Sequence, residues 1–138
     1  MDIQIAVLCD AATDNGGKLY ILGTFDTIFA SQSPAVHPQC AMALRVTFEK
    51  AEEGPHQVKF NFVDEDGKLV APIPDMAIEV SVPEDSIFVS RNFIINFQQF
   101  TFAKMGLYSI DIAIDGRQLG SIPLLVKQMP ASARQMGI

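Results

Sequence analysis

The chain contains few side chains that could bind a metal through sulfur or nitrogen. His37 and Cys40 stand three residues apart, and Cys9 and His56 complete this set. Zinc sites usually take four Cys, His or carboxylate ligands. Both cysteines fall on the apolar side of alternating runs, which favours buried structural thiols in a reducing compartment over metal ligands. His37 and His56 each adjoin a proline, and we expect both in loops.

Acidic turns offer a second kind of site, because calcium takes six to eight oxygen ligands from flexible loops. Asp64, Glu65 and Asp66 follow one another, and further carboxylates could join them from other loops: Asp10, Asp14, Glu84 and Asp85. Aspartate also favours turns for local geometric reasons. We therefore expect these residues to form turns, with a calcium site as the alternative.

No pattern typical of an enzyme is present. The sequence has no Gly-x-Ser-x-Gly elbow, glycine-rich phosphate loop or His-Glu-x-x-His helix. A carboxylate pair for glycoside hydrolysis depends on spatial separation, so it stays open. We expect a protein without catalytic activity and without a cofactor.

The elements that must position these side chains are predicted to be strands. Apolar residues alternate from Ile3 to Cys9 and again from Cys40 to Phe48, the period of a strand with one buried face. A third alternating run follows Gly106 and ends at Asp115-Gly116, a strong hairpin signal. Tyr108 just after Gly106 is typical of a tyrosine corner, so Gly106, Tyr108 and Gly116 are predicted to be structural.

Three segments are less regular. Lys18–Ala30 is predicted to be one strand with a bulge at Gly23, and Ser31–Gln39, with its two prolines, a surface loop. Phe93–Phe102 is aromatic and uncharged. It suits a central buried strand bent near Gln98-Gln99, or else a strand whose apolar face a second subunit covers.

Eight or nine such strands with turns between them predict an all-β fold, an antiparallel immunoglobulin-like β-sandwich. With 138 residues the chain fits one domain over residues 1–127, followed by a C-terminal tail over residues 128–138. The net charge of −6 and the ten scattered basic residues argue against nucleic acid and anionic membrane as partners. No apolar run approaches the roughly 18 residues of a membrane span, and no signal peptide is apparent, so we expect a cytoplasmic protein.

Several blocks together resemble a family of small bacterial proteins described as a domain of unknown function. They are Val7–Asp10, Gly17–Asp26, Val63–Gly67 and Gly106–Tyr108 with Asp115-Gly116, and the likeness spans nearly all of residues 1–127. The resemblance implies no activity, cofactor or catalytic residue. Asp26 at the end of the second block lies on a mostly apolar strand face, and two interpretations stay open: an exposed strand end, or a buried salt bridge to Arg45 or Arg91.

These observations predict a non-catalytic binding or assembly module, with a protein partner or self-association. The alternative is a small-ligand or carbohydrate binder that uses loops at one end of the sandwich, with His37 in its loop; a hydrolase comes third. The candidate contact residues are His37, Asp26, Asp64 and Asp66.

Overall fold

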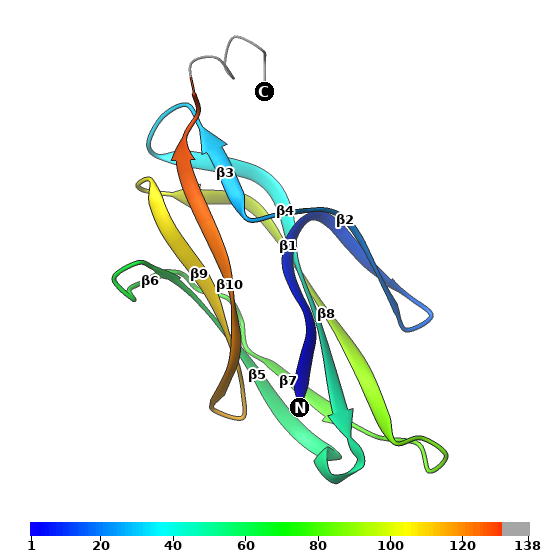
Figure 1. Ribbon diagram of the computed structural model, residues 1–138. Coiled ribbons are helices and arrows are strands. Elements are labelled where there is room, and N and C mark those ends of the chain that lie inside the picture. Colours follow the sequence, from blue (N-terminus) through cyan, green and yellow to red (C-terminus); the bar gives the residue numbers. More distant parts are fainter. Residues whose placement is uncertain (131–138) are drawn as a thin grey trace.

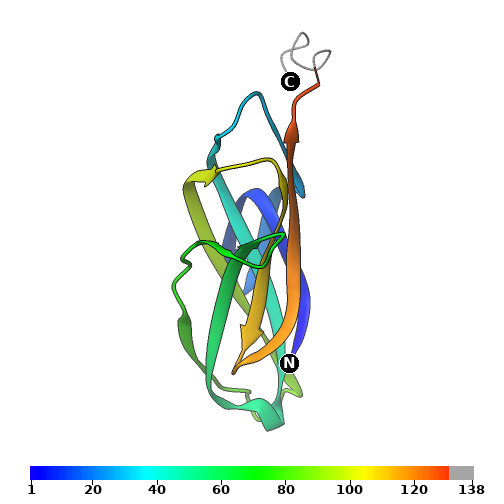
Figure 2. The same cartoon turned by 90° about the vertical axis from the view of Figure 1, so that its left-hand side faces the viewer.

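The computed structural model describes residues 1–130, and two β-sheets pack face to face in it (Figures 1 and 2). The four-stranded sheet, called sheet A, has the order β2 (Lys18–Phe25), β1 (Asp2–Asn15), β4 (Ala35–Glu49), β8 (Phe88–Phe102). Residues 131–138 of the predicted tail lie outside the described residues.

The six-stranded sheet, called sheet B, completes the sandwich. Its order is β3 (Thr27–Ala30), β10 (Arg117–Gln128), β9 (Gly106–Ile114), β5 (Gly54–Asp64), β6 (Leu69–Ala71), and β7 (Met76–Val80) also pairs with β5. The all-β, two-sheet expectation is confirmed, and residues 1–130 form ten strands rather than eight or nine. One pair departs from the antiparallel expectation, because β3 runs parallel to β10.

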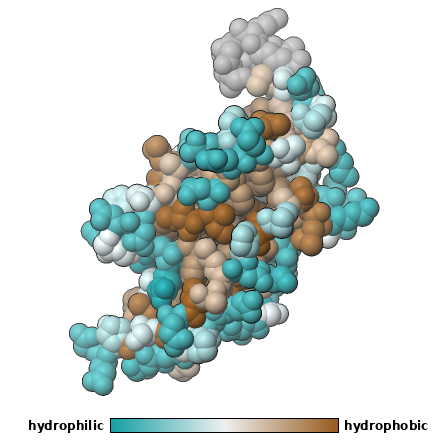
Figure 3. All heavy atoms as spheres, turned by 180° about the vertical axis from the view of Figure 1, so that it is seen from behind, coloured by the Kyte–Doolittle hydropathy of each residue, from teal (hydrophilic) through white to brown (hydrophobic). Residues whose placement is uncertain are grey.

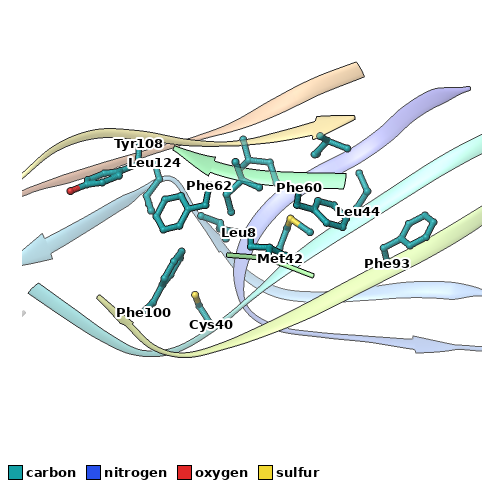
Figure 4. Close-up of a cluster of buried hydrophobic side chains, with 14 of the residues drawn as sticks. Leu8, Cys40, Met42, Leu44, Phe60, Phe62, Phe93, Phe100, Tyr108 and Leu124 are labelled. Carbon is teal, nitrogen blue, oxygen red and sulfur yellow. The ribbon is translucent and has the colours of Figure 1, made fainter. Parts of the chain in front are cut away.

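The core lies between the sheets and follows the predicted alternation. In β4 the inward residues are almost fully buried: Cys40, Met42, Leu44, Val46 and Phe48. Phe60 and Phe62 of β5 point toward them from sheet B, together with Tyr108 and Leu124 (Figure 4). The predicted hairpin is also present, since Asp115 and Gly116 have φ of 54° and 80° between β9 and β10.

The single strand predicted over Lys18–Ala30 is divided between the two sheets. Pairing of β2 with β1 runs through Gly23 without a register shift, so the predicted bulge is wrong. The break lies at Asp26, where the chain leaves sheet A and continues as β3 in sheet B. Alternation along a sequence does not show a change of sheet, because each half still has one apolar face: Leu19 and Ile21 of β2 pack on a small outer cluster, and Ile28 and Ala30 of β3 lie in the main core.

The predicted loop Ser31–Gln39 is shorter than expected, because β4 already begins at Ala35 and contains His37. Here β4 pairs with β8 alone, since its pairing with β1 stops at Ala41. Proline is tolerated at such a position because the strand pairs there on one side only, so no second strand needs the N–H group that proline lacks. The same holds for Pro55 beside His56 in β5, which there pairs only with β7. The expectation that both histidines lie in loops is therefore wrong.

The upper ends of β4 and β8 bend together toward sheet B (Figures 1 and 2). Pro38 of β4 lies opposite Gln99 of β8, whose φ is 54°, a left-handed conformation. Below this point Phe93 faces the core, and above it Phe100 and Phe102 do so. The predicted bend near Gln98-Gln99 therefore exists, and it changes which side chains of β8 point inward without ending the strand.

The β1–β2 hairpin forms a third layer over the outer face of sheet A. Ala41 and Ala43 belong to the face of β4 that the alternation leaves outside the core, yet they are fully buried there with Cys9. Leu19 and Ile21 of β2 pack on this small cluster. Hydrogen bonds from sheet A hold the tip of the β1–β2 hairpin. Arg45 Nη1 donates to the Gly17 carbonyl (3.0 Å), and Asn92 Nδ2 donates to Asp14 Oδ2 (2.8 Å). The small side chains of the two alanines allow the hairpin to approach closely.

The three-residue turn η1 (Lys50–Glu52) is the single helical element of residues 1–130. This part of the chain therefore has no helix that could span a membrane.

Candidate functional site

His37 lies on β4 at the end of the sandwich where the chain crosses between the sheets. It is half-buried, and its ring lies 5.4 Å from that of Phe25. Two adjoining hollows of about 400 and 370 Å³ meet at His37 and Phe29. The second of them also contains Asp10 and Thr27, so it combines apolar and polar side chains.

Asp26 is exposed at the crossing point. Its carboxylate accepts a hydrogen bond from the Thr27 hydroxyl (2.9 Å), and its backbone carbonyl accepts one from the Leu125 N–H (2.8 Å). Arg45 instead bonds Gln4, Gly17 and Asn92, and Arg91 donates to a backbone carbonyl of β7. The hypothesis of a buried salt bridge to either arginine is therefore wrong, and the exposed strand end is the correct interpretation.

Asp64 and Asp66 build the turn after β5. Asp64 Oδ1 accepts hydrogen bonds from the backbone N–H groups of Lys68 (3.0 Å) and Asp66 (2.9 Å). The bond from Lys68 is the main cause that lowers the pKa of Asp64. Asp66 lies 3.9 Å from the Lys104 ammonium. Across residues 1–130, no three His, Cys, Asp or Glu side chains gather as a metal site.

The candidate contact residues do not form one site. In sheet B, β10 and β9 lie between β3, which follows Asp26, and β5, which ends at Asp64. Three strand spacings amount to roughly 14 Å. The acidic turn and the His37 hollows are therefore separate places on the molecule.

The two cysteines are free and buried on opposite sides of sheet A. Cys40 faces the main core, whereas Cys9 lies under the β1–β2 hairpin. Burial raises the pKa of the Cys40 thiol to about 11 and raises the pKa of Cys9. Both are protonated at neutral pH, so they are poor nucleophiles and metal ligands.

His56 takes part in a cluster that sequence reasoning missed. Its Nδ1 lies 2.6 Å from Asp115 Oδ2, and its Nε2 lies 2.5 Å from the Glu52 carbonyl oxygen. Both partners are acceptors only, so the ring satisfies them only as an imidazolium that donates twice. The bond to Glu52 and then that to Asp115 raise the pKa of His56. His56 and Asp115 are 59 residues apart, so no local signal marks the pair.

The aromatic segment Phe93–Phe102 belongs to an edge strand. Sheet A ends at β8, which pairs with β4 on one side only, so the expected central position is wrong. Arg91 is the single charged residue of β8, and its Nη1 donates to the Glu79 carbonyl of β7 (2.9 Å). This bond links the two sheets below Phe93. From Asn92 upward, the free edge of β8 carries no charge.

Beside this free edge lies an apolar groove between β8 and β6. It has a volume of about 430 Å³ and is lined by Phe97 and Phe100 of β8, Phe62 of β5, and Val70 and Ile73 in and after β6. The rings of Phe97 and Phe100 stack at 4.6 Å, and Phe100 lies 4.8 Å from Phe62. The left-handed Gln99 permits this stacking, because it brings residues three apart in a strand onto one face.

Figure 3 shows the face of the molecule on the side of β8, β6 and β7, and hydrophobic residues gather across its middle. A polar margin surrounds them. An uncharged strand edge beside an apolar groove offers backbone hydrogen bonds and side-chain pockets together, the two requirements for adding a further strand to a sheet.

The model of the family of unknown function DUF6941 matches residues 4–127 of the chain. A comparison with curated proteins found no match.

Proposed function

Since the chain belongs to the family of unknown function DUF6941, whose description gives no activity, we propose its function from the structure alone: it is a non-catalytic binding or assembly module that takes a protein partner along the free edge of β8. The observation that carries this proposal is the position of β8, a strand of 15 residues with a neighbour on one side only.

The edge strands of sheet B suit a partner less well. In sheet B the edge strands β3, β6 and β7 have 4, 3 and 5 residues. Prolines 72 and 74 interrupt the edge between β6 and β7. Short strands, prolines and inward charges are the ways in which proteins protect their edges from further pairing. On β8, Arg91 protects the lower part, and the stretch Asn92–Gln98 lacks any of these features.

The chemical groups of the chain support a non-catalytic role. His56 has both ring nitrogens held by acceptors, so it cannot accept a proton from a nucleophile. The thiols of Cys9 and Cys40 have raised pKa values. Free buried thiols also support a reducing compartment, and we place the protein in a bacterial cytoplasm. The net charge of −6 favours a protein partner over nucleic acid or an anionic membrane.

Within this proposal we assign the sandwich to the immunoglobulin-like class. Two features support the assignment. First, the chain passes from sheet A into sheet B at β3, which pairs in parallel with β10, the last strand of the described residues. Second, the hydroxyl of Tyr108 at the start of β9 donates a hydrogen bond to the Lys104 carbonyl (2.6 Å). The second feature has the geometry of a tyrosine corner. The fold class by itself assigns no function.

Site-specific photo-crosslinking in the native cell tests the proposal. A photoreactive residue replaces Gln98, which is exposed on β8, and in a control it replaces Ser121, which is exposed on β10. We expect a discrete adduct from position 98 and none from position 121. Equal labelling from both positions, or no adduct from either, would contradict a binding edge at β8.

The pair of hollows at His37 supports a second candidate function, the binding of a small ligand that carries an apolar ring or sugar face. Phe25 and Phe29 offer surfaces for stacking, while Thr27 and His37 offer hydrogen-bonding groups. Ligand-detected NMR with a panel of monosaccharides and aromatic acids would test it. Binding that disappears in His37→Ala would support this candidate, and a panel with no binder would remove it.

A further inference from the structure

We propose that the partner at the edge of β8 is a second copy of this chain, joined by antiparallel pairing of the two β8 strands about a two-fold axis at Ile95. This inference rests on the proposed function and names its partner. A two-fold axis brings the same strand of both copies together in opposite directions, so the surface along this strand must be complementary to an identical copy of itself.

The inward face of β8 fits itself in this register. Ile95 lies opposite Ile95 of the second copy, and Phe93 lies opposite Phe97 of the second copy. Ile95 and Phe97 are only partly buried in one chain, although both pack on its core. Pairing covers them with apolar side chains, and aromatic and branched pairs across strands are stabilising.

The outward face of β8 is uncharged and, apart from Ile94, polar over the same stretch. Ile94 lies opposite Asn96 of the second copy, and Asn92 lies opposite Gln98 of the second copy. The bend at Gln99 limits this pairing to Asn92–Gln98. Seven residues per strand is an ordinary strand length.

The charge of Arg91 favours this register over an axis one residue earlier, at Ile94. Arg91 falls opposite Gln99 of the second copy, at the end of the pairing, and keeps its bond to Glu79. An axis at Ile94 would instead place Arg91 opposite Phe97, on the apolar inward face. Buried charge without a partner is costly. Although each chain carries a charge of −6, no two like charges of β8 face each other in the Ile95 register.

The test is the mass of the purified chain in solution by sedimentation equilibrium at micromolar concentration. We expect twice the mass of one chain. Asn96 is exposed, and its copy lies diagonally across the axis at roughly 7–8 Å. Asn96→Lys therefore places two like charges together and should weaken the dimer by roughly tenfold or more. Ser121→Lys, an exposed strand position away from β8, should leave the dimer unchanged.

A charge-swap experiment separates dimerisation from folding. Asn96→Lys and Asn96→Asp should each be monomeric and folded, and an equal mixture of the two should restore the dimer through opposite charges. A monomeric wild-type chain overturns the second-copy proposal. If the crosslink from position 98 nevertheless appears, with a mass other than two chains, the edge binds a different protein and the proposed function stands. A dimer that Asn96→Lys and Ser121→Lys affect equally also overturns the proposal.

Discussion

His56 shows how a polar side chain can be almost buried and still carry charge. Its side chain is 10% exposed, its ring packs at a tilt against Phe48 of the core, and its two nitrogens face Asp115 and the Glu52 carbonyl. The imidazolium links the turn after β4 to the turn between β9 and β10. Deprotonation would leave a nitrogen lone pair facing an oxygen, so the charged form is part of the folded state.

We predict that the contribution of His56 to stability falls as pH rises. The folded pKa of His56 is raised above its usual value near 6.5, so this stability is fully present below about pH 6.5 and is lost as pH rises through the folded pKa. The pKa of Asp115 is lowered, so its contribution is lost only in acid. Urea unfolding of the wild type and His56→Gln across pH 5 to 9 measures this. If the difference in the free energy of unfolding between the wild type and His56→Gln does not change with pH, the prediction is wrong.

The hydroxyl of Tyr108 supports a second prediction. Tyr108→Phe removes the bond to the Lys104 carbonyl while keeping the ring packed against Phe62 and Phe102. We expect a loss of about 1 kcal/mol in the free energy of unfolding. Tyr20→Phe is the control, because Tyr20 is half exposed on the hairpin and should change stability little. Equal losses at both positions would show that the bond contributes nothing specific.

The sequence predicts side-chain contacts correctly where the signal is local. Tyr108 and its acceptor Lys104 are four residues apart, and the glycine turn before the strand marks the motif. His56 and Asp115 could not be paired in this way, since only the packing of β5 beside β9 brings them together. The alternation of β4 predicted the buried row correctly but could not show that a hairpin covers its other face.

At the scale of the element, the β1–β2 hairpin depends on the small side chains beneath it. We predict that Ala43→Leu forces the hairpin away from sheet A, with a loss of about 1–3 kcal/mol from overpacking. Hydrogen exchange should increase in residues 11–22 more than in the core strands. Ala77→Leu on the exposed side of β7 is the matched control and should change neither quantity. Unchanged exchange in the Ala43 variant would mean that the hairpin does not need this close contact.

The sequence predicts the position of β8 in its sheet wrongly, since β8 is an edge strand and not a central one. Aromatic residues on both parities are typical of a strand covered on both sides, yet Phe97, Phe100 and Phe102 lie in the groove or at the bent upper end of the strand. Alternation shows which faces are apolar. It does not show how many neighbours a strand has, because the order of strands in a sheet is set by contacts between distant segments.

At the scale of the whole molecule, net charge opposes the assembly that the edge of β8 favours. Two chains of −6 repel each other, and salt screens this repulsion over about 10 Å at 0.1 M. We therefore predict that the proposed dimer tightens as salt rises from low to physiological concentration. Sedimentation equilibrium over a salt series measures the dissociation constant. A dimer that weakens with salt would indicate an interface held by opposite charges, contrary to the uncharged edge.

The parallel pairing of β3 with β10 determines when the sandwich can be completed during synthesis. Thr27 pairs beside Leu125, which lies 98 residues later in the chain (125 − 27), and β3 has no other neighbour in its sheet among the described residues. The ribosome releases β3 well before β10, and domains fold as their segments emerge. The backbone of Thr27–Ala30 therefore stays hydrated until β10 has emerged, and the joining of the two sheets at this edge follows the synthesis of β10.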